Sequence, residues 1–254
     1  MYLYYLITFF IFGLIFGSFF NVVGYRLPKG MSLVSPSSHC PKCEHKLTPV
    51  ELIPVFSWIF QCGKCKNCGC KIPIFYPIFE LLTGVIFALI YHVFGLSIST
   101  VIALVFASMI LILIISDLLY MIIPDELLIF CGILLFVLIV ARDGVNIIVP
   151  TLKNMVIPFV IMLLIKLLGD FIFKRESLGG GDIKLMLIFG MVLGWQLSVF
   201  ALVLAAFLSL PVSLITLKNN HSHEIPLGPY LGIAALICLI GRIDPSIITN
   251  YLGF

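Results

Sequence analysis

Charged residues are scarce in this chain of 254 residues: 11% are Asp, Glu, Lys or Arg, whereas 61% are hydrophobic. Long apolar runs recur along the sequence, and they exceed the length that a helix in a soluble core needs. This composition excludes a soluble globular protein and predicts an all-α, polytopic membrane protein. The net charge of +3 comes mainly from lysines and arginines in the connections between the runs. It indicates membrane orientation, and no nucleic-acid partner is expected.

The apolar runs predict about eight transmembrane helices, since one crossing needs about 20 predominantly apolar residues. The runs lie at residues 2–25, 76–94, 98–116, 122–141, 156–173, 183–193, 197–217 and 230–248. The run at 183–193 is short for a separate crossing, but Gly194 and Trp195 after it suit a tight turn at the bilayer surface. We expect three parts: a first transmembrane helix at 1–25, a small cysteine-rich insertion at 26–75, and a multi-helix membrane domain at 76–254.

The first apolar run lacks two features of a secretory signal peptide, a basic amino-terminal region and a small-residue cleavage site. It is also longer than the hydrophobic region of such a peptide. We therefore expect it to remain attached as a transmembrane helix.

The basic residues fall mainly in alternate connections, and basic residues are retained on the cytoplasmic side of a membrane. Three follow even-numbered runs, namely Arg142, Lys153 and Arg242. Eleven follow odd-numbered runs, namely Arg26, Lys29, Lys42, Lys46, Lys64, Lys66, Lys71, Lys174, Arg175, Lys184 and Lys218. This pattern predicts a multi-pass protein of a prokaryotic inner (plasma) membrane, with the odd-numbered connections in the cytoplasm. Asp117 ends the third run and Asp182 opens the sixth, so both are predicted at the cytoplasmic face.

One polar insertion, from Arg26 to about Phe75, carries six of the eight cysteines. It contains two C-x-x-C pairs with 21 residues between them, Cys40 with Cys43 and Cys65 with Cys68. Disulfides are disfavoured in the cytoplasm, and two such pairs are typical of a four-cysteine zinc ribbon. So small a loop buries little core, and structural zinc would therefore supply much of its folding free energy.

The ligand set of this zinc site has alternatives. Cys62 also forms a C-x-x-C pair with Cys65, Cys70 is a further thiol, and His39 and His45 flank the first pair. Cys62 and Cys70 are otherwise interpreted as reduced thiols that bind no metal.

Two aspartates stand where apolar runs meet polar connections, and ionisable residues are costly in a membrane. Asp117 precedes the turn at residues 123–125, and Asp182 follows three glycines at 179–181, which let a substrate approach closely. Hydrolysis of a peptide bond can use one ionised carboxylate to activate water and one protonated carboxyl to polarise the carbonyl. Two carboxyl groups held close together do not both ionise easily, so one pair can supply both functions. We predict that Asp117 and Asp182 form a catalytic pair.

Each aspartate also has a structural interpretation, Asp182 as a helix N-cap and Asp117 as a surface acid at a helix end. The glycine run, the proline turn and the matched topology together favour catalysis. Glu80, Asp125 and Glu126 are interpreted either as acceptors for basic side chains of a substrate or as interfacial and packing acids.

These motifs resemble those of the type IV prepilin peptidases, membrane aspartic proteases marked by a Gly-x-Gly-Asp sequence, here residues 179–182. The resemblance covers nearly the whole chain. It also includes residues 17–28, the two cysteine pairs, residues 75–80, Asp117 with residues 123–125, and the late turn at 225–229. Each motif is weak alone, but their occurrence in order is specific.

This resemblance implies removal of the short basic leader from type IV prepilins and from the pseudopilins of secretion and competence systems, at the cytoplasmic face. It also implies N-methylation of the new amino terminus from S-adenosylmethionine. It carries over the catalytic pair, Asp117 and Asp182, and the zinc tetrad, Cys40, Cys43, Cys65 and Cys68. No residue is carried over for the methyl donor, because no Gly-rich nucleotide-type fingerprint is visible. The partners implied are prepilin substrates and the lipid bilayer.

Two other classes of function are alternatives to this one. In an ion-coupled transporter, aspartates within the membrane relay protons, and internal repeats carry matching interruptions. The cysteine insertion and the glycine run have no such counterparts in this sequence. A membrane-anchored zinc-binding adaptor without chemistry would leave the placement of the aspartates unexplained.

Overall fold

The computed structural model describes residues 1–174, 178–218 and 226–243. Within these ranges the chain is helical, and its only β-type pairing consists of two isolated bridges. The chain divides into two compact units, Met1–Thr100 and Val101–Phe254. Three parts of the sequence predictions lie outside the described residues: Arg175, Ile225 of the late turn, and residues 244–248 of the eighth run.

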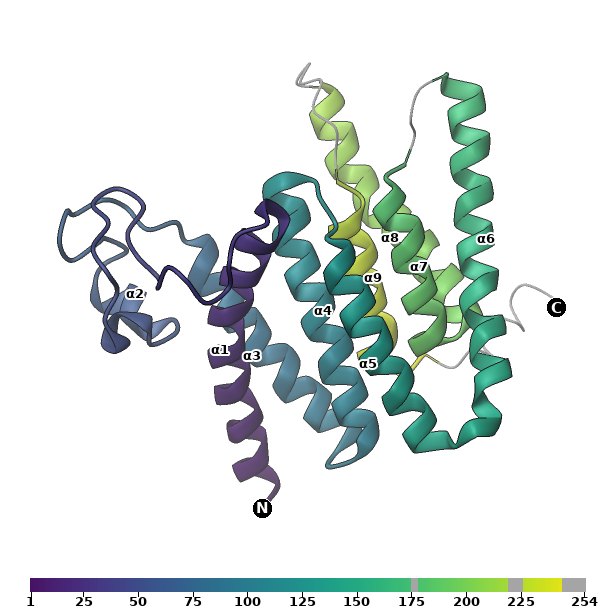
Figure 1. Ribbon diagram of the computed structural model, residues 1–254, viewed down its shortest axis with the longest axis horizontal. Helices are drawn as coiled ribbons and strands as arrows, with labels where there is room; N and C mark the ends of the chain where they lie inside the picture. Colours follow the sequence, from purple (N-terminus) through teal and green to yellow (C-terminus); the bar gives the residue numbers. More distant parts are fainter. Residues whose placement is uncertain (175–177, 219–225, 244–254) are drawn as a thin grey trace. The chain divides into compact units, whose positions relative to one another are not determined.

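In the first unit, α1 (Tyr2–Arg26) packs along α3 (Phe75–Phe94) (Figure 1). The backbones approach closely, because a Cβ placed on Gly13 would lie 2.7 Å from the Cα of Gly84. A Cβ placed on Gly17 would lie 2.8 Å from the Cα of Glu80. Small residues four positions apart permit such contact between membrane helices. The α1–α3 pair therefore depends on these glycines.

The cysteine-rich insertion between these helices has short elements in place of a layered core. They are the 3₁₀ turns η1 (Leu27–Lys29) and η2 (Pro49–Leu52) and the helix α2 (Phe56–Phe60). Two antiparallel bridges, His39 with Lys46 and Lys64 with Lys71, each close a loop around one cysteine pair. The loops that carry the cysteines are thus defined by local backbone bonds.

Glu80 joins the insertion to the helix pair. It is 9% exposed, and its Oε2 accepts the backbone N–H of Val55 at 2.6 Å. The Ser18 side chain of α1 is a second hydrogen-bond partner of its carboxyl group. These contacts favour the interpretation of Glu80 as a packing acid.

The second unit holds the remaining helices. They are most of α4 (Ile98–Tyr120), α5 (Asp125–Asp143), the 3₁₀ turn η3 (Val145–Ile147), α6 (Ile148–Phe173), α7 (Gly180–Leu193), α8 (Trp195–Lys218) and α9 (Gly228–Ile240). The short helix α7 contacts α5, α6, α8 and α9. Phe189 of α7 is fully buried against Phe106 of α4, with ring centroids 5.6 Å apart. A Cβ on Gly190 would collide with the carbonyl oxygen of Asn154 in α6. The helix α7, which carries Asp182, is thus packed against neighbouring helices on several sides.

Each of the eight predicted apolar runs overlaps one helix, which confirms the all-α class for the described part of the chain. Five helical segments there are long and apolar enough to cross a membrane, namely Tyr2–Lys29, Phe75–Phe94, Ile98–Tyr120, Val145–Phe173 and Trp195–Thr216. At 14 and 13 residues, α7 and α9 span only about 20 Å, less than the roughly 30 Å of a hydrocarbon core. The eight crossings stay a prediction.

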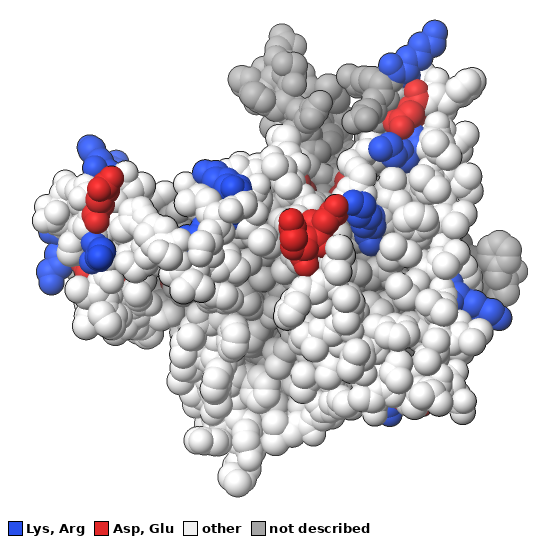
Figure 2. All heavy atoms as spheres, in the orientation of Figure 1, with Lys and Arg blue, Asp and Glu red and all other residues white. Residues whose placement is uncertain are grey.

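The outer surface of the second unit is apolar. The most apolar windows of Val145–Phe173 and Trp195–Thr216 are only 11% buried inside the protein. Much of the face drawn in Figure 2 carries no charged side chain. Such exposure of apolar helices is expected where lipid is the surrounding solvent.

Candidate active site and metal centre

Asp117 lies in the last turn of α4, which continues to Tyr120 beyond the predicted end of the third run. Met121 ends the helix in a left-handed conformation, with φ of 54°, and its N–H donates to the Asp117 carbonyl oxygen at 2.9 Å. Asp117 is only 6% exposed. Its carboxylate accepts the backbone N–H of Gly228, the first residue of α9. It is therefore a buried acid, in contrast to the surface acid of the structural interpretation.

Asp182 is the third residue of α7, because this helix begins at Gly180 and not at the predicted start, Ile183. Its carboxylate accepts the backbone N–H of Gly179, the residue that caps the helix. This bond is the reach-back half of a capping box, so Asp182 supports the helix start without being its N-cap. Asp182 is 6% exposed, and its Oδ1 is buried with no hydrogen-bond partner among the described residues. A carboxyl oxygen in this position can carry a proton.

Ile123 and Gly228 link the two aspartates. A Cβ on Gly228 would collide with the Asp117 carboxylate and lie 3.5 Å from Cδ1 of Ile123. On the other side, a Cβ on Gly181 would lie 2.7 Å from the Cβ of Ile123. Ile123 thus packs between Gly181, which precedes Asp182, and Gly228, which contacts Asp117. The carboxylates are near enough for the charge of Asp117 to act on Asp182.

An ion pair joins the helix that carries Asp182 to the helix that follows the Asp117 turn. Nζ of Lys184 donates to both carboxylate oxygens of Asp125, at 2.8 and 2.7 Å. Asp125 is the first residue of α5, and Lys184 follows Asp182 by two residues in α7. The two side chains are 52% and 55% exposed, so this pair lies at the accessible edge of the unit. Asp125 is therefore already engaged by a basic group of the chain itself.

The backbone next to Asp182 is accessible. Gly179 and Gly180 are exposed, and a Cβ on Gly180 would meet no atom of the described residues within 4 Å. The first two glycines of the run are therefore accessible, and the approach of a substrate backbone to them stays a prediction.

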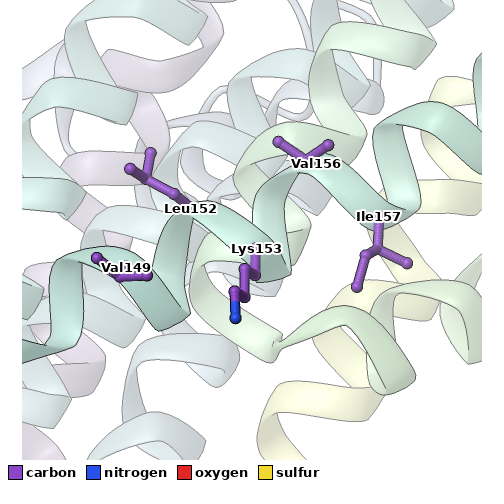
Figure 3. Close-up of a pocket in the computed structure, with 5 residues that line it drawn as sticks. All are labelled: Val149, Leu152, Lys153, Val156 and Ile157. Atoms are coloured by element: carbon purple, nitrogen blue, oxygen red, sulfur yellow. The ribbon is translucent and has the colours of Figure 1, made fainter.

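The cavity drawn in Figure 3 lies away from these residues. It is lined by Val149, Leu152, Lys153, Val156 and Ile157, all from α6. Its lining residues include neither aspartate and only one ionisable side chain. A hollow along a single helix lacks the convergent polar groups of a binding site, and we assign it no function.

The four predicted zinc ligands converge in the first unit. The Sγ atoms of Cys40, Cys43, Cys65 and Cys68 all lie within 4.8 Å of one another. Cys40 and Cys68 are 3.8 Å apart, and Cys43 and Cys65 are 3.9 Å apart. Four sulfurs around a tetrahedral zinc ion, each bonded at about 2.3 Å, lie about 3.8 Å from one another. The cluster therefore fits zinc.

Backbone groups favour the thiolate form that zinc requires. The N–H groups of Lys42 and Cys43 lower the pKa of Cys40 to about 6. Asn67 adds a hydrogen bond from its side-chain nitrogen to the sulfur of Cys43, at 3.7 Å. Such bonds spread the negative charge that gathers when thiolates bind one ion.

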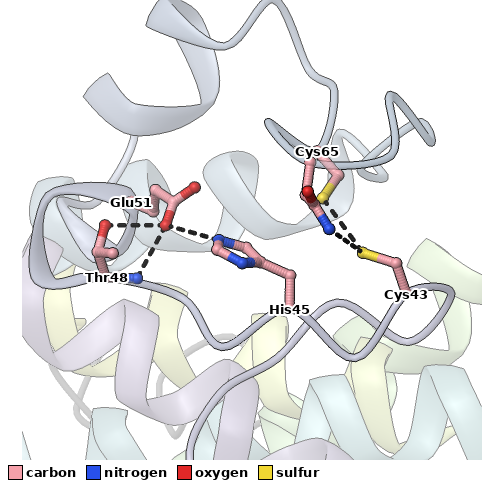
Figure 4. A network of polar contacts seen from close by, with 6 residues as sticks. Cys43, His45, Thr48, Glu51 and Cys65 are labelled. Atoms are coloured by element: carbon pink, nitrogen blue, oxygen red, sulfur yellow. Dashed lines mark hydrogen bonds and ion pairs between the residues drawn. The ribbon is translucent and has the colours of Figure 1, made fainter.

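The two flanking histidines have other partners. His45 Nε2 lies 3.3 Å from Oε2 of Glu51, which also accepts the Thr48 N–H at 2.9 Å and hydroxyl at 2.8 Å (Figure 4). The bond from the Thr48 N–H is the main reason that the pKa of Glu51 is lowered to about 2. His39 Nδ1 lies 2.9 Å from the Ser37 carbonyl oxygen. Neither histidine belongs to the four-sulfur cluster.

Two further residues contact these sites, and the sequence alone predicts no role for either. Gly228 supplies the N–H to Asp117, and its only signal was its place in the late proline–glycine turn. Cys70 is a spare thiol in the sequence pattern, but its Sγ lies 3.4 Å from that of Cys40. Cys62, the other spare thiol, is exposed.

Two family models match the chain. The bacterial peptidase A24 N-terminal domain matches residues 11–94, which contain the cysteine cluster. The type IV leader peptidase family matches residues 104–214, which contain Asp117 and Asp182. Each match falls within one of the two compact units.

Relatives with curated names match over almost their full length. The chain is 35% identical to the prepilin leader peptidase/N-methyltransferase of Bacillus subtilis, over 96% of each protein. It is 31% identical to the protein of the same name from Aeromonas hydrophila, over 96% of this chain and 93% of that protein. The Pseudomonas aeruginosa protein of that name is 29% identical, over 95% and 91%. No solved structure matches the chain.

Proposed function

The chain belongs to the type IV leader peptidase family, and we propose that Asp117 and Asp182 are the carboxylates with which it removes the leader peptides of prepilins. The enzyme is a membrane endopeptidase, and the names of its relatives join N-methyl transfer to this activity. The resemblance drawn from the sequence motifs is thereby confirmed. The observation that supports the catalytic pair is that both carboxylates are buried and lie near enough for the charge of Asp117 to act on Asp182.

Hydrolysis at this pair requires one ionised and one protonated carboxyl group. The ionised group takes a proton from the attacking water, while the protonated group donates to the scissile carbonyl oxygen as that oxygen gains negative charge. The proton taken from water then passes to the leaving amine. The N–H groups of Gly228 and Gly179 hold the two carboxylates in orientation. Oδ1 of Asp182, which lacks a partner in the described part of the chain, is free to carry the shared proton.

The substrate class fits a site at the end of membrane helices. A prepilin has an apolar helix of its own after the leader, and this helix would dock laterally among the helices of the enzyme. The scissile bond would then lie at the exposed backbone of Gly179 and Gly180. The distribution of lysines and arginines supports an inner-membrane protein whose site faces the cytoplasm.

Two groups from outside the chain belong to the proposal. Zinc would be a structural ion of the 26–75 insertion, held by the tetrad Cys40, Cys43, Cys65 and Cys68, and its binding would stabilise the folded loop. S-adenosylmethionine would supply the methyl group for the second activity. No residue is assigned to its binding.

Conversion of either aspartate to asparagine tests the proposed pair. We expect Asp117→Asn and Asp182→Asn to leave a coexpressed prepilin uncut, although both proteins insert into the membrane at normal levels. Asp143→Asn is the matched control, because Asp143 is the last residue of α5 and pairs with its neighbour Arg142. The readout is the mass of the amino-terminal peptide of the pilin, which also shows whether a methyl group has been added. A processed pilin with either aspartate variant would reject the pair.

A further inference from the structure

Cys70 is a fifth thiol at the four-sulfur cluster. Its Sγ lies 3.4 Å from that of Cys40, closer than the 3.8 Å between Cys40 and Cys68. Its side chain also interacts with that of Cys68 and with the charge of Cys65. Cys70 is half-buried, whereas Cys62 is exposed. The two spare thiols of the sequence therefore have different surroundings.

The backbone fixes Cys70 in this position. Its carbonyl oxygen accepts the N–H of Cys65 at 2.8 Å, and the Gly69 N–H donates to the Cys65 carbonyl oxygen at 2.8 Å. Gly69 has φ of 69°, a left-handed conformation that suits glycine. This closed turn presents the sulfurs of both Cys68 and Cys70 to Cys40.

We propose that Cys70 is a reserve zinc ligand that can replace Cys40. Two sulfurs on one tetrahedral zinc ion lie about 3.8 Å apart, so a sulfur beside Cys40 needs only a small shift to reach the ion. Zinc has no geometric preference from its d-electrons, and a structural site holds four ligands. In the zinc-loaded protein Cys70 would take the place of Cys40 as the fourth thiolate, and the Cys70 proton would pass to Cys40. No oxidant is needed.

The zinc content of the purified, full-length protein tests this exchange without reference to peptidase activity. The wild-type protein and Cys40→Ser should each hold about one zinc per chain, because Cys70 completes the tetrad in the variant. Cys43→Ser, which has no thiol in reserve, should lose most of its zinc, and so should Cys40→Ser/Cys70→Ser. The matched control is Cys40→Ser/Cys62→Ser, which should retain zinc. Loss of zinc from Cys40→Ser, or its retention in Cys40→Ser/Cys70→Ser, would overturn the proposal.

A second measurement uses the wild-type protein and does not depend on how the variants fold. The zinc-loaded protein is treated briefly with an alkylating reagent, and the modified cysteines are mapped by mass spectrometry in molecules that still hold zinc. Exchange predicts molecules labelled at Cys40 and others labelled at Cys70, but none labelled at both. Labelling of Cys70 alone would show that Cys40 never leaves the ion.

Discussion

At the scale of single residues, each aspartate of the proposed pair accepts a backbone N–H from a glycine. Gly179 belongs to the same connection as Asp182, whereas Gly228 comes from a helix distant in sequence from Asp117. A side chain at position 228 would occupy the space of the Asp117 carboxylate. The orientation of Asp117 therefore depends on the absence of a Cβ in α9.

Gly228→Ala should lower the rate of leader removal by about 100-fold or more, because small displacements of a reacting group cost about that much. The added Cβ collides with the Asp117 carboxylate and must push it from its place. Gly132→Ala is the matched control, since its Cβ would meet Ile188 only at an ordinary 3.7 Å. Cleavage of a synthetic prepilin by the purified enzymes measures the difference. An unchanged rate in Gly228→Ala would show that the contact does not position Asp117.

The sequence predicted the aspartates and the four cysteines because their own neighbours in the chain identify them. Glycines and a proline mark the two carboxylates, and the C-x-x-C spacing marks the thiols. Gly228 and Cys70 could not be assigned this way, because their roles depend on contacts with Asp117 and Cys40 that only the folded chain creates.

At the scale of helices, the Lys184–Asp125 pair joins the start of α7 to the start of α5. Both side chains are about half exposed, and pairs of this kind typically contribute no more than about 1 kcal/mol. The pair is therefore expected to adjust the position of α7, which carries Asp182, relative to α5, and not to hold the fold together.

Reversal of each charge should reduce leader removal several-fold, because Asp125→Lys and Lys184→Asp both replace attraction by repulsion. The double variant Asp125→Lys/Lys184→Asp should recover most of the activity, with the fall and recovery in kcat more than in KM. Steady-state kinetics of the three purified variants make the comparison. A double variant no better than the single ones would exclude the ion pair as a positioning contact.

Glu80 is the corresponding link in the first unit, between α3 and Val55 of the insertion. Glu80→Ala removes the acceptor of the half-buried Val55 N–H, at a cost of about 1 kcal/mol. We expect faster proteolysis of the insertion near Val55, whereas Glu80→Gln, which keeps an acceptor oxygen, should be cut at a rate closer to that of wild type. Equal cleavage of all three proteins would argue against this link.

Helix ends were harder to predict than helices. Glycine is a poor helix former, so the sequence placed the start of α7 at Ile183. In the structure α7 begins at Gly180, because the side chain of Asp182 reaches back to the N–H of Gly179 and packing holds Gly181 against Ile123. A side-chain bond and a tertiary contact thus outweigh the local propensity.

At the scale of the whole molecule, the metal centre and the aspartate pair lie in different units. The four-sulfur cluster and its fifth thiol belong to the first unit, and both aspartates belong to the second. Each of the two family models matches residues of one unit only. Hydropathy predicted the helices well, since apolar length is a property of sequence alone. The number of membrane crossings is harder to predict from hydropathy. The helices α7 and α9 are short, α5 has charged residues at its ends, and all three are partly buried in the protein.

We propose that Asp117 and Asp182 act as one catalytic unit. The rate at which the purified enzyme removes the leader of a prepilin tests this proposal, measured by mass spectrometry for wild type, Asp117→Asn, Asp182→Asn and the double variant. We predict that each single variant loses about 1000-fold or more, and that the double variant is no slower than either, because members of one unit are not additive. A single variant that keeps about a tenth of the wild-type rate, or losses that multiply in the double variant, would show that the two aspartates do not act as one unit.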